Sequence, residues 1–339
     1  MVDDERASSA SAANLKVSVL IATRDRPDSL ARALRSVLAL CYLNFEVVVV
    51  DNAPNGDQTP VMLADQFACE PRIRYVRERR PGLARAHNAG LRAIDAPIVA
   101  ITDDDVLVDS DWLDHITTAF ATSPDVVCVT GMIVAAELVT PAQHWVEEHL
   151  GFDKGNQRRA FDLGANRPPD PLFPYTAGSL GSGANMSFRT SFLREIGGFD
   201  PALGAGSKAR GGDDLAAFYE AMMRGYRLVY EPAAVVRHYH HRTYEQLHRQ
   251  VRGYGVGLGA FLTKAVLERP RTVATLAVRS APALRHLRRM RRAAPAKFSV
   301  SFDKRFERLP RIERLYTLAG PWAYLQARRQ VRNQLEGSR

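Results

Sequence analysis

Residues 96–105 read APIVAITDDD, an apolar run of strand-forming residues that stops at three consecutive acids. Such a run predicts a buried strand that brings Asp103, Asp104 and Asp105 to the carboxyl edge of a sheet, where open α/β sheets bind ligands. Adjacent carboxylates repel one another unless a cation or hydrogen-bond donors face them, and hard oxygen ligands favour Mg²⁺ or Mn²⁺. The alternative is a solvated acidic loop that caps the helix expected at residues 109–119.

The segments before this run alternate between strand and helix patterns. Leu30, Leu34 and Val37 form one apolar stripe of a helix, and residues 45–50 are almost continuously apolar, as expected of a strand covered on both faces. The expected strands are residues 16–22, 45–50, 72–76 and 97–102, and the expected helices are residues 27–38, 60–68 and 82–94. This order predicts an α/β fold with a doubly wound, mostly parallel sheet and helices on both faces.

The pattern changes after residue 125. We expect a strand at 126–135, an irregular stretch at 152–174, helices at 190–196 and 213–223, short strands at 227–230 and 233–236, and basic helices beyond 244. The predicted organisation is a disordered tail at residues 1–15, one α/β domain at residues 16–265, and a basic helical C-terminal extension at residues 266–339.

The net charge of +9 conceals an asymmetry along the chain. Residues 270–339 hold 17 Lys and Arg against 4 Asp and Glu, whereas the rest of the chain has a small acidic excess. An anion-binding surface is therefore expected on the extension and not on the α/β domain. No uncharged stretch approaches the ~18 residues of a membrane-spanning helix, and the three cysteines lack metal-ligand spacing. These features predict a cytoplasmic protein with reduced thiols.

One segment of the extension is expected to join a cationic helix face to an apolar one. Its arginines are Arg285, Arg288, Arg289, Arg291 and Arg292, its apolar residues are Leu284, Leu287 and Met290, and Pro282 and Pro295 bracket it. This pattern suits an anionic membrane surface, which would hold the protein at the inner face of the cytoplasmic membrane. The alternative is that the arginines solvate a helix packed on the α/β domain.

Two common nucleotide-binding motifs are missing from the sequence. It contains no Gly-x-x-x-x-Gly-Lys-Ser/Thr run, and the first strand leads into Ala22–Asp25 instead of a glycine turn. Glycines alternate in Tyr254–Gly259, but this segment follows a helix and not a strand, so a packing role is predicted. The sequence therefore argues against P-loop hydrolysis and dinucleotide redox chemistry.

The strand ends instead predict a site for a nucleoside diphosphate. Thr23, Asp51 and Asp103 end the first, second and fourth strands, so a parallel sheet brings them to one edge. Asp51 can accept an N–H from a nucleobase, and Asp103 can bind ribose hydroxyls. Asp105 can ligate a metal that neutralises the diphosphate. Each acid alone could instead cap a helix or lie in a loop.

These motifs together resemble the family 2 glycosyltransferases, which have the GT-A fold. The matching stretches are VSVLIAT at 17–23, EVVVVDN at 46–52, GLARAHNAG at 82–90, TDDD at 102–105, GANMSFR at 183–189, GGFD at 197–200 and GDD at 212–214. Their order and spacing over residues 16–245 carry the resemblance. It implies transfer, with inversion, of a sugar from a nucleotide-sugar to an acceptor with the help of a divalent metal.

The resemblance implies donor-side roles for several residues. Because the acidic run has three members, Asp104 could exchange roles with either neighbour. His238 is the preferred further metal ligand, with His240 and His241 as alternatives. The residues that would bind the nucleotide-sugar are Thr23, Asp51, Arg85, Asp103 and Asp104, and Asp105 would hold Mn²⁺ or Mg²⁺.

On the acceptor side, the resemblance assigns the catalytic base to Asp214 in preference to Asp213. Displacement at an anomeric carbon has an oxocarbenium-like transition state, and a carboxylate must deprotonate the incoming hydroxyl. The pair begins a helix after a glycine loop, so the alternative is a helix cap with a first-turn acid. Tyr175, Asn185 and Arg189 fall in the acceptor region of the family.

The expected donor is a nucleoside-diphosphate sugar, with UDP-sugars favoured, and the expected acceptor is a hydroxyl of a glycan or lipid-linked glycan. Nucleic acid is not expected as a partner, because strand-end acids are a poor anchor for a polyanion. Two other functions stay open. One is a sugar-nucleotide nucleotidyltransferase, although such enzymes usually carry a glycine-rich loop after the first strand. The other is a non-catalytic module that binds a membrane or nucleic acid through the basic extension.

Overall fold

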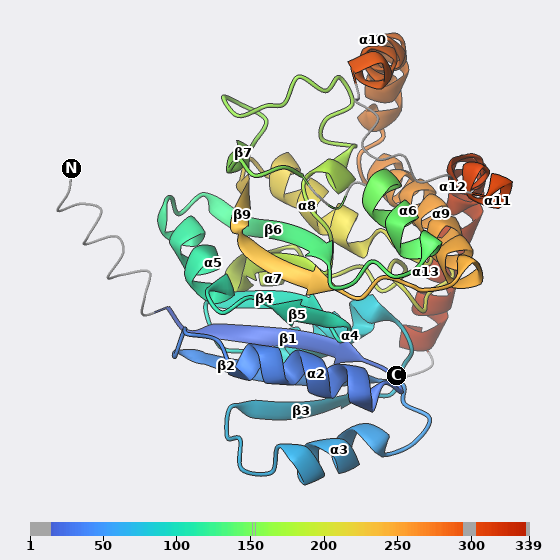
Figure 1. The fold of residues 1–339 in the computed structure, drawn as a ribbon. Helices are drawn as coiled ribbons and strands as arrows, with labels where there is room; N and C mark the ends of the chain where they lie inside the picture. Colours follow the sequence, from blue (N-terminus) through green and yellow to red (C-terminus); the bar gives the residue numbers. More distant parts are fainter. Residues whose placement is uncertain (1–14, 151, 153, 294–302, 337–339) are drawn as a thin grey trace.

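A computed structural model describes residues 15–150, 152, 154–293 and 303–336, and Figure 1 shows their fold. Within these ranges nine strands form one mixed sheet in the order β3-β2-β1-β4-β8-β6-β9-β5, with β7 paired to β9. Helices cover both faces of this sheet, which confirms the predicted α/β fold class. The tail predicted at residues 1–15 lies outside the described residues, apart from its last residue.

The parallel half of the sheet carries the predicted polar strand ends. Its strands are β1 (Val17–Thr23), β2 (Phe45–Asn52), β3 (Ile73–Glu78) and β4 (Ile98–Asp103). β1 lies between β2 and β4, and the register places Thr23 opposite Asp51 and Ala22 opposite Asp103. The three strand ends therefore meet at one edge of the sheet.

Two hydrophobic clusters pack on opposite faces of the sheet. Side chains of successive residues in a strand point to opposite faces, so Val19 packs in one cluster and Leu20 in the other. On the Val19 face lie α2 (Pro27–Leu38), α3 (Gln58–Gln66) and α5 (Trp112–Ala121). On the Leu20 face lie α4 (Leu83–Ala93), α7 (Thr190–Glu195) and α8 (Asp213–Met223). The buried stripe Leu30, Leu34 and Val37 of α2 agrees with the predicted amphipathic helix.

The second half of the sheet departs from the prediction in two places. Its strands are β5 (Val106–Val108), β6 (Val126–Ala135), β7 (Arg159–Phe161), β8 (Asn185–Arg189) and β9 (Arg227–His238). β7 lies inside the stretch expected to be irregular. The two short strands expected at 227–230 and 233–236 are one strand, since the ladder with β6 resumes at Val235 after Glu231. Residues 232–234 bulge out of the ladder, where Pro232 could not donate a hydrogen bond.

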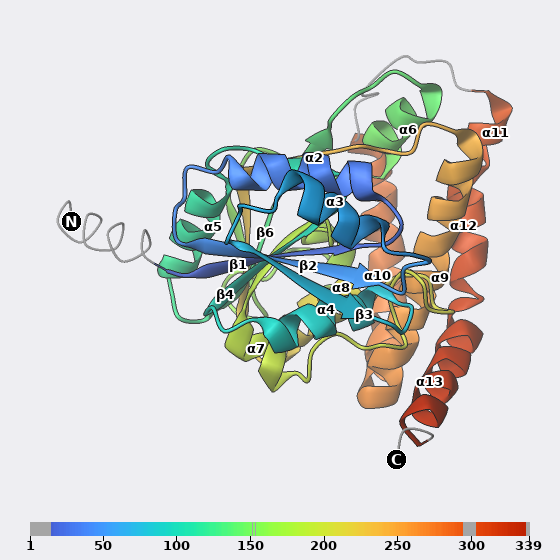
Figure 2. The same ribbon diagram turned by 90° about the horizontal axis from the view of Figure 1, so that it is seen from below.

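Five helices follow β9 and form the C-terminal region of the described chain. They are α9 (Tyr244–Glu268), α10 (Arg271–Ala293), α11 (Lys304–Glu307), α12 (Leu309–Thr317) and α13 (Gly320–Glu336). Figure 2 shows α9, α12 and α13 side by side at one end of the molecule. None of the helices in the described ranges combines the length and hydropathy needed to cross a bilayer.

The predicted short helix between Pro282 and Pro295 is instead part of a longer helix. Pro282 lies inside α10, which begins at Arg271, because a single proline removes only one helical hydrogen bond. Arg285 is exposed. The other side chains of this predicted face lie outside the described part of the structure. They are Leu284 and the residues from Leu287 to Arg292.

Candidate active site

The three consecutive acids lie between β4 and β5. Asp103 ends β4, and β5 begins directly after Asp105. β5 pairs with β9 so that Val106 lies opposite His238, which brings this imidazole to the acidic turn. One ligand atom from each of Asp103, Asp105 and His238 lies within 4.8 Å of the others. Two carboxylates and an imidazole in this arrangement are a suitable donor set for a divalent ion such as Mn²⁺.

Burial disfavours the ionised form of the carboxyl groups in this turn. Burial and the negative charge of Asp105 raise the pKa of Asp103 to about 7. Burial also opposes ionisation of Asp105, but its hydrogen bond with His238, the charge of His238 and the charge of Arg26 outweigh burial and lower its pKa. The His238 Nε2 lies 3.3 Å from Asp105 Oδ1. A divalent cation among these groups would offset the repulsion between the two carboxylates.

Asp104 contacts the end of β1 and the turn that follows it. Its Oδ2 accepts a hydrogen bond from the Thr23 hydroxyl at 2.7 Å, and its Oδ1 accepts one from Arg26 Nη1 at 3.1 Å. The same Arg26 nitrogen lies 3.1 Å from Asp105 Oδ2. Arg26 is thus a site residue that the sequence analysis missed, although the polar turn after the first strand contains it. Asp104 thus joins Thr23 to Arg26, while Asp105 contacts both Arg26 and His238.

His240 contacts His238 and supports it as a candidate metal ligand. His238 Nδ1 lies 2.9 Å from His240 Nδ1, and His240 Nε2 lies 3.0 Å from Glu147 of α6 (Pro141–His149). Such a chain fixes the orientation of an imidazole that can ligate a metal. Of the three candidate histidines, His238 is the one whose ring nitrogen is grouped with Asp103 and Asp105.

The end of β2 carries a buried carboxylate, Asp51, the residue that the sequence analysis assigned to the nucleoside. Asp51 is fully buried, and the Tyr75 hydroxyl donates to its Oδ2 at 3.0 Å. Burial raises the pKa of Asp51. Its Oδ1 has no hydrogen-bond partner within the described chain, and a ligand N–H could satisfy it. Arg85, the other nucleoside candidate, donates to Gln334 of α13 at 2.6 Å.

The second acidic pair begins α8. Asp214 accepts hydrogen bonds from the backbone N–H groups of Gly183 at 3.1 Å and Leu215 at 2.8 Å, which fix its carboxylate. Gly212 precedes the pair with φ of 88°, a left-handed conformation that glycine adopts readily. Burial raises the pKa of both acids, and that of Asp213 reaches about 7. A raised pKa suits a carboxylate that has to accept a proton.

His87 is another residue whose importance the sequence analysis did not identify. It lies in α4, is 1% exposed, and places Nδ1 3.9 Å from Asp213 Oδ2. Neither ring nitrogen has a hydrogen-bond partner in the part of the chain that the structure describes. Burial lowers the pKa of His87 to about 4, so the ring is neutral at pH 7. The ring also packs against Phe199, with centroids 5.0 Å apart.

Both acidic sites open into one cavity of about 510 Å³, which is lined by Asp103, Asp213, Asp214 and His87 among other residues. Its apolar lining includes Leu150, Phe152, Tyr175, Leu215, Tyr254 and Leu258.

Among the three acceptor candidates, Tyr175 lines this cavity. Asn185 instead donates to the carbonyls of Met132 and Ala234. Arg189 donates to the carbonyls of Val126 and Phe120. Asn185 and Arg189 therefore make structural hydrogen bonds to the backbone and do not line the cavity.

Comparison with known proteins agrees with the family resemblance of the sequence. Residues 18–181 match the family model described as glycosyl transferase family 2. The pre-mycofactocin glycosyltransferase of Mycobacterium tuberculosis is 30% identical over 66% of this chain and 43% of its own length. The chain thus spans less than half of that relative. The glucosyl-dolichyl phosphate glucuronosyltransferase of Haloferax volcanii is 25% identical over 66% of this chain and 69% of its own length.

A solved structure shows the same fold. The mannosyltransferase of Pyrobaculum calidifontis, solved in complex with GDP-Man and Mn²⁺, superimposes with a TM-score of 0.58. The alignment covers 95% of this chain and 97% of that protein at 19% identity. The GT-A fold expected from the sequence is therefore confirmed, including the helical C-terminal region.

Proposed function

Since this chain is a family 2 glycosyltransferase by its match over residues 18–181, we propose that it transfers a sugar with inversion from a nucleoside-diphosphate sugar to a hydroxyl acceptor. UDP-sugars are the favoured donors, and the acceptor is a glycan or lipid-linked glycan. Asp103, Asp105 and His238 would hold Mn²⁺ or Mg²⁺. When bound, the ion would neutralise charge on the leaving diphosphate.

The observation that carries this proposal is the shared cavity. Asp103 reaches it from the donor edge of the sheet, and Asp213 and Asp214 reach it from α8. A donor whose diphosphate lies at the acidic turn would present its anomeric carbon toward the second pair. Inversion needs one carboxylate on the acceptor side, and the pair at the start of α8 supplies it.

Each proposed step uses residues with defined positions. Asp51 would accept an N–H from the base, while Thr23, Asp104 and Arg26 form the turn beside the nucleotide. Asp214 would take the proton of the acceptor hydroxyl, whose oxygen forms a bond to the anomeric carbon. The bond from that carbon to the diphosphate breaks, and the nucleoside diphosphate leaves with the electron pair.

Donor hydrolysis tests the proposed activity directly. The protein is incubated with a panel of UDP-, GDP- and other nucleotide-sugars in Mn²⁺ or Mg²⁺, and released nucleoside diphosphate is measured. Release from one donor, abolished by a chelator, is the expected result. Pyrophosphate release from a nucleoside triphosphate and a sugar phosphate would indicate a nucleotidyltransferase instead. Donor binding without any turnover would indicate a binding module.

We also propose that the C-terminal helices contact the inner face of the cytoplasmic membrane, at a place other than the segment chosen from the sequence. Leu315, Leu318 and Trp322, near the junction of α12 and α13, are 66%, 78% and 65% exposed. Arg311 and Arg314 beside them are exposed as well. Apolar side chains next to cations suit an anionic bilayer surface, where each basic residue contributes about 1 kcal/mol.

Sedimentation with vesicles tests this contact. Binding to phosphatidylglycerol-containing vesicles should be strong at low salt and weak at high salt. Leu318→Glu combined with Trp322→Glu should abolish it, whereas Val61→Glu, at an exposed position of α3, should not. Equal sedimentation with neutral and anionic vesicles, or none with either, would contradict the proposal.

A further inference from the structure

Helix α9 packs directly on the loop that precedes Asp213. A Cβ atom on Gly257 would lie 2.8 Å from the carbonyl carbon of Gly211, and one on Gly212 would lie 2.6 Å from the carbonyl oxygen of Gly257. A side chain at either position would push the two segments apart, so glycine is required for this contact. α9 therefore helps to set the position of the loop from which the second acidic pair extends.

The opposite side of α9 packs equally closely on α12. A Cβ atom on Gly255 would collide with the carbonyl oxygen of Glu313, and one on Gly259 would collide with that of Thr317. The alternating glycines thus let α9 fit between the loop before α8 and the last helices. This arrangement confirms the packing role that the sequence predicts for Tyr254–Gly259.

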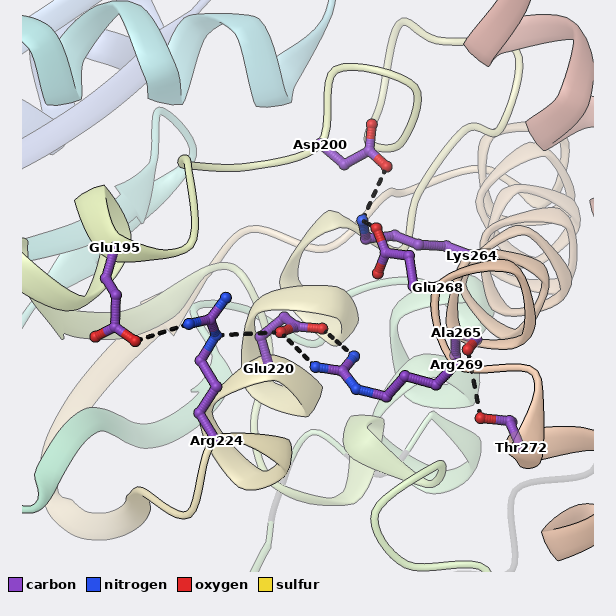
Figure 3. Close-up of polar contacts among 9 residues, drawn as sticks. All are labelled: Glu195, Asp200, Glu220, Arg224, Lys264, Ala265, Glu268, Arg269 and Thr272. Atoms are coloured by element: carbon purple, nitrogen blue, oxygen red, sulfur yellow. Dashed lines mark hydrogen bonds and ion pairs between the residues drawn. The ribbon is translucent and has the colours of Figure 1, made fainter.

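An ion-pair network holds the far end of α9 against α8 (Figure 3). Arg269 donates to both carboxylate oxygens of Glu220 in α8, at 2.6 and 3.0 Å. Lys264 of α9 lies 3.3 Å from Asp200, which also accepts a hydrogen bond from Tyr324 of α13 at 2.9 Å. Separation of these partly buried pairs would leave charges uncompensated, so the network favours a single position of α9.

This position makes α9 a wall of the catalytic cavity. Tyr254 and Leu258 are one helical turn apart, and both line the cavity together with Glu313 of α12. Tyr254 keeps 37% of its surface exposed. The lining also includes the apolar side chains of Leu150, Phe152, Tyr175 and Leu215, beside polar ones such as Lys154, Thr176 and Arg210. An apolar group of the acceptor would gain the free energy of leaving water against the apolar part of this lining.

We propose that the acceptor carries an apolar group close to its reacting hydroxyl, and that Tyr254 and Leu258 of α9 bind this group. The inference rests on the proposed glycosyltransferase function and specifies its acceptor class. The group could be an alkyl chain or an aromatic ring, because both would bury the same wall. The reacting hydroxyl loses its proton to Asp214, as in the transfer step described above.

Simple alcohols test this proposal before the natural acceptor is known. The full-length protein, with Mn²⁺ and the donor that it hydrolyses fastest, is given methanol, ethanol, propanol, butanol and pentanol, and the alkyl glycosides are quantified by mass spectrometry. Burial of each added methylene should raise kcat/KM by about fourfold. Benzyl alcohol reacting faster than pentanol would identify an aromatic group, and the reverse an alkyl chain. A flat series would overturn the proposal.

Two substitutions test whether side chains of α9 cause the increase in kcat/KM per methylene. Leu258→Asn and, separately, Tyr254→Ser should reduce the increase per methylene toward onefold. Leu267→Asn is the matched control, because Leu267 is on the same helix, 45% exposed and outside the cavity lining. The increase per methylene compares alcohols within one variant, so a general loss of activity cancels.

Donor hydrolysis by water separates failure of this inference from failure of the proposed function. If no donor releases nucleoside diphosphate, the glycosyltransferase assignment fails and the inference fails with it. If donors are hydrolysed but the alcohol series is flat, or is unchanged in both Leu258→Asn and Tyr254→Ser, only the apolar acceptor is overturned.

Discussion

Replacement of Gly257 by alanine tests how tightly the C-terminal helices are coupled to the acidic pair. Alanine is favoured over glycine inside a helix by about 1 kcal/mol, so the substitution would stabilise α9 alone. In the protein the new methyl group would meet the backbone of Gly211 at 2.8 Å, and relief of such a contact costs about 1–3 kcal/mol. We expect the free energy of unfolding to fall by up to about 2 kcal/mol, with a loss of transfer as the loop before Asp213 shifts.

Gly253→Ala is the matched control for this substitution. It lies one turn earlier on α9, and its Cβ would lie 3.7 Å from the carbonyl oxygen of Arg210, an ordinary contact. It should gain about 1 kcal/mol of unfolding free energy and keep its activity. Urea unfolding followed by circular dichroism gives the stabilities, and released nucleoside diphosphate gives the activities. Equal stability and activity of the two variants would refute the reasoning.

Four further predictions concern the candidate site residues. Asp105→Asn should lower turnover by about a hundredfold or more, and a chelator should mimic it, whereas full activity in excess chelator would remove the metal from the mechanism. Asp214→Asn should lower transfer by about 10²- to 10⁴-fold and leave the affinity for the donor, measured by calorimetry, unchanged. Loss of donor affinity would assign the pair to the donor site. His87→Leu should raise the unfolding free energy by about 1 kcal/mol, because two unpaired buried nitrogens disappear, yet slow transfer; unchanged transfer would limit His87 to packing. Because burial raises the pKa of Asp214 and brings that of Asp213 to about 7, kcat/KM should fall as the pH drops below 7, and a profile flat to pH 5 would contradict these shifts.

The sheet edge that carries Thr23, Asp51 and Asp103 could be predicted because its sequence signals are local. β1, β2 and β4 are each a short, mostly apolar run that ends at a polar residue, and parallel pairing places such ends at the same edge. The common edge follows from that rule, whereas the exact register, with Thr23 opposite Asp51 and Ala22 opposite Asp103, comes from the structure. The helices between the strands carry a 3.6-residue apolar period, which is also local.

The direction of each acidic side chain could not be predicted in the same way. Asp104 and Asp105 are adjacent and chemically identical, yet one meets Thr23 and the other meets His238. The difference depends on β5, a strand of three residues with no measurable period, and on its pairing with β9 far along the chain. His87 was missed for a related reason, since it lies 3.9 Å from Asp213, a residue far along the chain at the start of α8.

The net charge of the C-terminal region does not show which of its cations bind other parts of the protein. The excess of arginine predicts an anion-binding extension, but some cations are used inside the protein, as where Arg279 donates to the carbonyl of Phe173. The exposed apolar residues Leu318 and Trp322 belong to the same group of helices as the cavity wall at Leu258, yet they do not line the cavity. Loss of vesicle binding in a Leu318 and Trp322 variant should therefore leave the increase per methylene of the alcohol series unchanged. A joint loss of both properties would mean that these helices act as one unit, through which membrane contact sets the shape of the acceptor wall.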